Sequence, residues 1–158
     1  MRHGIKVFKF GGTSVGTADR MDEVAALCRE HAAHGAIVVV SSAMAGVTDR
    51  LVALIEMAQA GAADEIADAV TALREFHESA LASLGSRIEL EAEFNTLARL
   101  HDSLLQLLTA AAHLGEVTPR AHDRIACAGE KMAVRILSVA FRRSGLACVS
   151  FDADTFLE

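Results

Sequence analysis

A glycine-rich turn follows the first apolar segment of the chain and leads into a segment with helical periodicity. It reads Lys9-Phe10-Gly11-Gly12-Thr13-Ser14, so a lysine ends the expected strand, two glycines form the turn and two hydroxyl residues follow. Glycines let the main chain approach a ligand closely, and the unpaired amides at a helix start favour an anion. The run therefore predicts a strand–turn–helix unit that binds phosphate, the alternative being an ordinary βα turn with a surface lysine.

The spacing matches neither of the two common nucleotide-binding loops. A P-loop places its lysine after the glycines, whereas Lys9 precedes them. The dinucleotide-binding fingerprint needs Gly-x-Gly-x-x-Gly, which Gly11, Gly12 and Gly16 do not form. The turn is therefore a different phosphate-binding loop, or none.

Hydrophobic periodicity predicts strands and helices in alternation, interrupted by a long helical stretch. We expect strands at 5–10, from 36 onward and at 146–151, and helices at about 17–33, 47–60, 62–84 and 119–143. The first two strands are near-continuous apolar runs, as in a parallel sheet covered on both faces. Pro119 follows Thr118, a favoured order at a helix start.

The central stretch predicts a helical hairpin beside the sheet. Ser86-Arg87-Ile88-Glu89 has the form of a capping box, which begins a second long helix that Gly115 ends. The apolar stripe of this helix has a period of about 3.5 residues. It consists of Leu90, Phe94, Leu97, Leu104, Leu108 and Ala111. His101 lies on the stripe and is expected to be a core or interface histidine.

Composition excludes several classes of protein. A net charge of −6 argues against a nucleic-acid surface, and no apolar run approaches the length of a membrane span. Three widely spaced cysteines indicate reduced thiols, and neither they nor the seven histidines form a recognisable metal or thiol-catalysis pattern. The first residues lack the apolar core of a signal peptide. We therefore expect a soluble, cytoplasmic protein without a metal site of its own.

Four segments resemble motifs of aspartate kinases, which belong to the amino-acid kinase family. They are residues 9–14, the run Ser42-Ala43-Met44-Ala45-Gly46-Val47-Thr48, the run Gly129-Glu130-Lys131-Met132, and the closing segment 145–153. Their order and spacing are similar to those of the family over the whole chain. The resemblance implies an α/β fold: a three-layer α/β/α sandwich of the amino-acid kinase, carbamate kinase-like type, truncated and with a helical hairpin insertion. Residues 1–158 would then be the amino-terminal, amino-acid-binding part of the kinase domain, without the nucleotide-binding half or the regulatory ACT domains.

The resemblance also implies a reaction and its residues. The family phosphorylates the β-carboxylate of L-aspartate with ATP, which carries Mg²⁺, in the first step towards lysine, threonine and methionine. Lys9 would be catalytic, and the phosphate or ATP would be bound by Lys9, Gly11, Gly12, Thr13 and Ser14. Aspartate would be bound by Ser42, Thr48 and Glu130. The full-length parent is expected to be a homo-oligomer, and the isolated 158-residue chain is expected to be inactive.

Each of these residues also has a structural alternative. Glu130 has small or apolar neighbours three and four residues away, so its carboxylate needs a cation, either within the fold or on a ligand. Gly129 would leave room for that ligand. Ser42 and Thr48 could bind a substrate carboxylate, or a hydroxyl there could cap the following helix, and Thr13 and Ser14 have the same ambiguity.

Two further hypotheses for the function remain open. The chain could be an incomplete kinase module that binds a substrate, or a partner through its helical hairpin, without catalysis. It could also belong to another kinase of the same fold.

Overall fold

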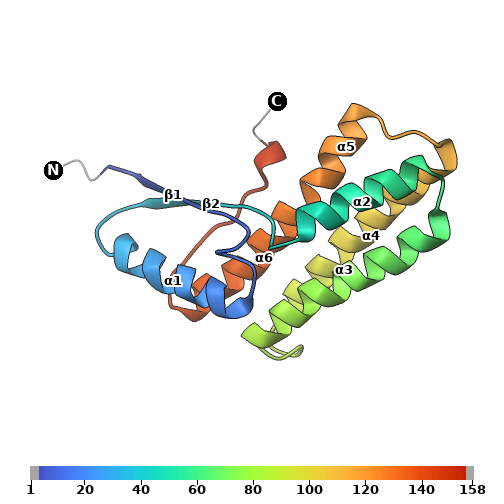
Figure 1. Cartoon of the computed structure of the whole chain (residues 1–158). Coiled ribbons are helices and arrows are strands. Elements are labelled where there is room, and N and C mark those ends of the chain that lie inside the picture. Colours follow the sequence, from blue (N-terminus) through green and yellow to red (C-terminus); the bar gives the residue numbers. More distant parts are fainter. Residues whose placement is uncertain (1–3, 156–158) are drawn as a thin grey trace.

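The computed structural model describes residues 4–155 and consists of a small parallel sheet beside a larger helical body (Figure 1). The strands are β1 (Lys6–Phe10) and β2 (Ile37–Ser41). The helices are α1 (Ala18–Ala32), α2 (Val47–Gln59), α3 (Ala63–Leu84), α4 (Glu91–Leu114), α5 (Pro119–Ala126) and α6 (Ala128–Arg143), followed by the short 3-10 turn η1 (Ala153–Thr155). No helix in this described part of the chain has the length and apolar character needed to cross a membrane.

The sheet is covered on one face. β1 and β2 pair in parallel, with Lys9 opposite Val40 and Phe10 opposite Ser41, and α1 connects them. Both α1 and α6 contact β2, and they lie on the same side of the sheet (Figure 1). Phe10, Ile37 and Val39 point towards this side and pack against the core.

The opposite face of the sheet is open among residues 4–155, so the expectation of two covered faces holds for one face only. Val7 is 66% exposed, and Val38 and Val40 are 46% and 48% exposed. Strands that are apolar on both sides normally carry a helical layer on each face. The apolar character of these strands is therefore greater than the described residues can bury.

The predicted strand at 146–151 is wrong for the described structure, in which this segment is extended but unpaired. No backbone hydrogen bond joins its residues 147–151 to either strand of the described sheet. The segment lies along α6, where Arg135 donates hydrogen bonds to Ser150 Oγ at 2.8 Å and Asp152 Oδ1 at 2.6 Å. Val149 and Phe151 remain exposed. A strand requires the backbone of a neighbouring strand, and residues 4–155 supply none beside this segment.

The helical body contains most of the core, and the predicted hairpin is confirmed. α3 and α4 pack against each other and against α2 and α6. On α4, the predicted stripe residues Phe94, Leu97, Leu104, Leu108 and Ala111 are buried, and Leu90 packs partly buried at its start. The hydrogen bonds of the predicted capping box form, because Ser86 N–H donates to Glu89 Oε2 at 2.9 Å and Glu89 N–H donates to Ser86 Oγ at 3.3 Å. They close a turn at 87–90, however, and α4 begins only at Glu91, without a side-chain cap, so the box does not begin the helix as predicted.

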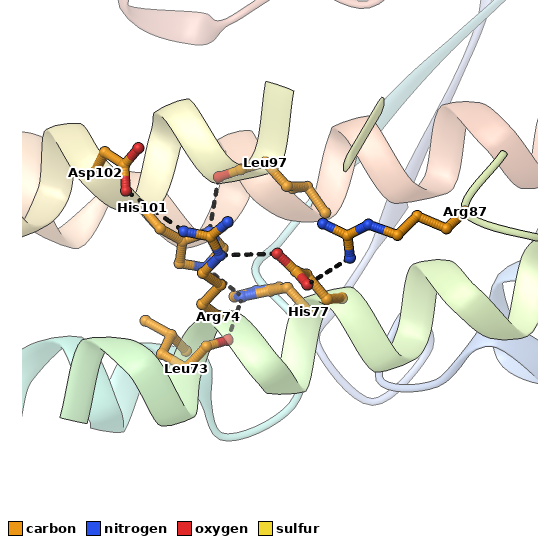
Figure 2. A network of polar contacts seen from close by, with 8 residues as sticks. Leu73, Arg74, His77, Arg87, Leu97, His101 and Asp102 are labelled. Atoms are coloured by element: carbon orange, nitrogen blue, oxygen red, sulfur yellow. Dashed lines mark hydrogen bonds and ion pairs between the residues drawn. The ribbon is translucent and has the colours of Figure 1, made fainter. Parts of the chain in front are cut away.

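Two histidines meet in the interior of the hairpin (Figure 2). His77 of α3 and His101 of α4 are 0% and 1% exposed. His101 Nδ1 lies 2.7 Å from the Leu97 carbonyl, and His77 Nδ1 lies 3.0 Å from the Leu73 carbonyl and 3.2 Å from His101 Nε2. Because a carbonyl can only accept, both Nδ1 atoms carry the proton in this arrangement. His101 is therefore a core histidine, as predicted.

The single helix predicted at 119–143 is two helices, because the main chain bends at Cys127. Thr118 caps α5 as expected, accepting a hydrogen bond from Ala121 N–H at 3.2 Å. Cys127 has a ψ of −7°, whereas a continuing α-helix has about −42°. The bend allows α5 to pack on α2 and α4 through the buried Ile125 while α6 packs on α1 and β2.

Candidate functional site

The glycine turn connects β1 to α1 and leaves its hydroxyl groups uncommitted. In this first loop (residues 11–16), Ser14 N–H donates to the Gly11 carbonyl at 2.9 Å, and the buried Val15 anchors the turn in the core. Thr17, not Thr13 or Ser14, caps α1 by accepting a hydrogen bond from Arg20 N–H at 3.3 Å. The capping alternative for Thr13 and Ser14 is therefore removed.

Lys9 stands on the open face of the sheet, one residue before the end of β1. Its side chain is exposed, and it forms no ion pair with any residue in the range 4–155. Gly11 lies two residues after Lys9, and the space where its Cβ would lie is open. A lysine without a carboxylate partner beside open backbone is suited to neutralise an anion.

The second loop (residues 42–48) connects β2 to α2. Ser42 N–H donates to the Phe10 carbonyl at 3.0 Å and so continues the pairing of the strands into the loop. Ala43 and Met44 are buried, and Gly46 has a φ of 75°, which favours glycine. No side chain caps α2, and Thr48 is exposed. The capping role proposed as an alternative for Ser42 and Thr48 is absent, so the first turn of α2 keeps unpaired N–H groups that favour an anion.

The first and second loops pack directly against each other through glycines. A Cβ on Gly12 would lie 3.0 Å from the Ala43 carbonyl oxygen, and a Cβ on Gly16 would lie 3.1 Å from Ala45 Cβ. The contribution of Gly16 was not foreseen from the sequence. The small residues of the run 43–46, opposite a loop with three glycines, are the signal that indicates such a close approach.

Gly129 brings the third motif to the same place. It is buried in the first turn of α6, and a Cβ there would lie 2.8 Å from both Ala43 Cβ and Val47 Cγ1. The expectation that Gly129 leaves room for a ligand is therefore wrong, because the second loop already occupies the space beside it. Three sequence motifs that are far apart in the chain meet around residues 43–47.

Glu130 follows Gly129 and is half-buried in the first turn of α6. Its Oε2 atom is inaccessible and has no hydrogen-bond partner among residues 4–155. A buried carboxylate oxygen without a donor is costly, so a native structure usually provides one, from the protein or from a ligand. The structural alternative for Glu130, an internal salt bridge, is not formed with any of the described residues.

The site thus combines complementary charges around one loop. Among residues 4–155, its lysine forms no ion pair, its helix start has no side-chain cap, its hydroxyl groups do not cap a helix, and one oxygen of its carboxylate has no hydrogen-bond partner. This set can bind a molecule with both an anionic and a cationic group and can stabilise a further anion beside it. Within residues 4–155, no group of three or more His, Cys, Asp or Glu side chains is arranged to hold a metal ion.

Comparisons with known proteins identify the family of the chain. Residues 4–158 match the sequence profile of the amino acid kinase family. The chain is 35% identical over 150 residues to bifunctional aspartokinase/homoserine dehydrogenase 1 of Arabidopsis thaliana, covering 93% of this chain and 16% of that protein. It is 30% identical to aspartokinase 3 of the same plant, covering 93% of this chain and 25% of the relative. The chain therefore spans a quarter or less of the length of these relatives.

Solved structures show the same fold. Aspartokinase III of E. coli in complex with lysine and aspartate superposes with a TM-score of 0.74 at 28% identity, over 90% of this chain and 30% of that one. Its complex with aspartate and ADP superposes with a TM-score of 0.71 at 29% identity, over 88% and 29%. The predicted α/β fold of the amino-acid kinase type is confirmed. From its sequence profile, its relatives and its fold, the chain belongs to the amino acid kinase family.

Proposed function

We propose that residues 1–158 are the amino-acid-binding part of an aspartate kinase domain, which transfers the γ-phosphoryl group of ATP to the β-carboxylate of L-aspartate. The observation that carries this proposal is the partnerless, buried Oε2 of Glu130 beside the second loop. An α-ammonium group is the natural partner for such a carboxylate. The names of the relatives and the aspartate bound in the E. coli structures support the choice of amino acid.

Each side chain then has a defined part in the reaction. Glu130 binds the α-ammonium group, and Ser42, Thr48 and the uncapped start of α2 bind a substrate carboxylate. Lys9 and the amides of the first loop, with Thr13 and Ser14, stabilise the charge on the transferring phosphoryl group. Phosphoryl transfer is accelerated mainly by positioning and charge neutralisation, which is what these groups offer. Mg²⁺ would enter with ATP rather than through a protein cage.

The test of this proposal is Glu130→Gln, which keeps the shape of the side chain and removes its charge. A charged hydrogen bond is worth about 1.5–3 kcal/mol, so we expect the affinity for L-aspartate to fall about tenfold or more. The affinity for ATP should change little. Calorimetric titration with aspartate and steady-state kinetics of the full-length kinase measure the two effects.

A matched control separates this role from a structural one. Glu91→Gln removes an exposed carboxylate from the first turn of α4, where it has the same favourable position at a helix start. It should leave aspartate binding unchanged. If Glu130→Gln instead lowers thermal stability and leaves the aspartate dependence intact, the carboxylate is structural and the proposal fails.

The open face of the sheet favours a second candidate for the chain taken alone, an incomplete module that binds but does not catalyse. Val7, Val38 and Val40 are exposed, and 146–151 has no strand beside it among the described residues. Exposed strand edges recruit partners. We expect the isolated chain to self-associate and to show no aspartate-dependent ATP turnover. Sedimentation and a coupled ATPase assay test this, and a monomer that phosphorylates aspartate would contradict it.

A further inference from the structure

The second loop is held between glycines on two sides. On one side Gly12 and Gly16 approach Ala43 and Ala45, with a Cβ on Gly12 only 3.0 Å from a main-chain oxygen. On the other side Gly129 approaches Ala43 and Val47, and a Cβ on Gly129 would lie 2.8 Å from a side-chain atom of each. Ordinary contacts of a Cβ lie at 3.4–4 Å, so both sides are packed more closely than side chains would allow.

The residues around Gly129 have little free space into which they could move if a side chain were added there. Ala43 and Val47 are 1% and 0% exposed, and Leu51, which would lie 3.2 Å from a Cβ on Gly129, is fully buried. Ala43 has no flexible side chain that could turn away, since its Cβ moves only with the main chain. A methyl group at position 129 would have to separate α6 from the second loop by roughly 0.6 Å to restore ordinary contacts.

We propose that Gly129 is a positioning residue, which sets the distance between the Glu130 carboxylate and the hydroxyl groups of Ser42 and Thr48. The inference rests on the proposed function, because it assumes that these groups bind opposite ends of one amino acid. Glu130 follows Gly129 in the first turn of α6, so the two move together. Ser42 and Thr48 are the first and last residues of the second loop, against which Gly129 packs. The distance between Gly129 and the second loop therefore determines how far the Glu130 carboxylate lies from the hydroxyl groups of Ser42 and Thr48.

The test is Gly129→Ala in the full chain, with L-aspartate as the probe. Displacing one side of a two-ended site by a fraction of an ångström should weaken aspartate binding by about tenfold or more. The affinity for ATP in the full-length kinase should stay within about twofold, because the nucleotide does not span the same gap. The KM for aspartate should rise accordingly.

Two further variants separate positioning from general damage. Gly115→Ala at the end of α4 strains a φ of 65° but has no atom within 4 Å of the new Cβ, so it lowers stability without moving the site. It should leave aspartate binding within about twofold of the unaltered chain. Ala43→Gly together with Val47→Ala reopens the space and should restore binding to Gly129→Ala.

The outcomes distinguish this inference from the proposed function. If the unaltered chain does not bind aspartate, the proposed function fails, and a crystal structure of Gly129→Ala still decides the positioning role. That structure should show Glu130 displaced from Ser42 by about 0.5 Å or more, and the rescued variant should show it returned. Unchanged aspartate affinity in Gly129→Ala, or equal loss in Gly115→Ala, would overturn the inference.

Discussion

The α3–α4 hairpin and the second loop differ in how their charged side chains are paired, although a neutral buried atom of the hairpin, His77 Nε2, also lacks a hydrogen-bond partner among residues 4–155. In the α3–α4 hairpin, charged side chains satisfy one another: Arg74 donates to Glu78 at 2.8 Å and lies 3.5 Å from Asp102, and Arg87 donates to Glu78 at 3.2 Å (Figure 2). Around the second loop, Lys9 has no ion pair within residues 4–155, and one oxygen of Glu130 has no donor. Both regions are well packed, so packing does not explain the difference.

Under the proposed function, this difference separates a region that supports the fold from a region that binds a ligand. The paired charges of the hairpin lie near the surface, where Arg87 and Asp102 are 65% and 62% exposed, so each pair contributes only about 0–1 kcal/mol to stability. A binding site keeps groups unpaired until the ligand arrives, which lowers the stability of the empty protein. Substitutions should therefore affect binding at the second loop and stability in the hairpin, with little overlap.

The largest expected effect is at Lys9. Lys9→Ala in the full-length kinase should lower turnover roughly 100- to 1,000-fold, as loss of one preorganised group at a developing charge does. Thermal stability should not change, since the side chain is exposed and unpaired among the described residues. Lys6→Ala, at the exposed start of the same strand, is the control and should retain activity. Near-normal turnover of Lys9→Ala would remove Lys9 from the catalytic site.

The next largest expected effect is a loss of folding stability at acidic pH, caused by a buried histidine of the hairpin. Burial, followed by the neighbouring His101, lowers the pKa of His77 from 6.5 to about 4. The unfolded chain therefore binds a proton below pH 6.5 that the folded chain resists, so stability is fully present above 6.5 and is lost as the pH falls towards 4. This difference corresponds to about 3 kcal/mol. Urea unfolding at several pH values between 7.5 and 4 measures it.

Two variants identify the source of this acid sensitivity. His77→Phe keeps a ring in the core and removes the titrating group, so its stability should depend less on pH than that of the unaltered chain. His113 of α4 lies 2.8 Å from the Thr109 carbonyl through its Nδ1 atom, as His77 of α3 lies 3.0 Å from the Leu73 carbonyl, but His113 is exposed. His113→Gln should retain the full dependence. Equal slopes for all three proteins would assign the acid sensitivity to other groups.

The smallest effects compare two threonines at helix starts. Thr17 caps α1, so Thr17→Ala should lower the free energy of unfolding by about 1 kcal/mol without changing aspartate binding. Thr48 follows the start of α2 without capping it, so Thr48→Ala should leave stability unchanged. Its loss of a hydrogen bond to the substrate, about 0.5–1.5 kcal/mol, should weaken aspartate binding roughly two- to tenfold. Thermal denaturation and calorimetric titration with aspartate measure both effects in both variants. Weaker aspartate binding in Thr17→Ala, or lower stability in Thr48→Ala, would contradict these assignments.

Local patterns in the sequence determined most of the secondary structure. The stripe of α4, the capping box at Ser86, the cap at Thr118 and the glycine turn each depend on residues within a few positions of one another, so they can be read along the chain. The candidate side chains came from the resemblance of four short motifs to those of aspartate kinases, and the residues alone left a structural alternative open for each of them.

The tertiary structure decided how those segments meet. The bend at Cys127, the unpaired segment 146–151 and the open face of the sheet depend on which elements lie alongside, which periodicity does not encode. The role of Gly129 is the clearest case. Along the chain it is a small residue before a carboxylate, and only the approach of Ala43 and Val47, more than eighty positions away, makes its missing side chain necessary. Close packing between distant residues is a property of the folded chain, so the close contact at Gly129 could be recognised only in the tertiary structure.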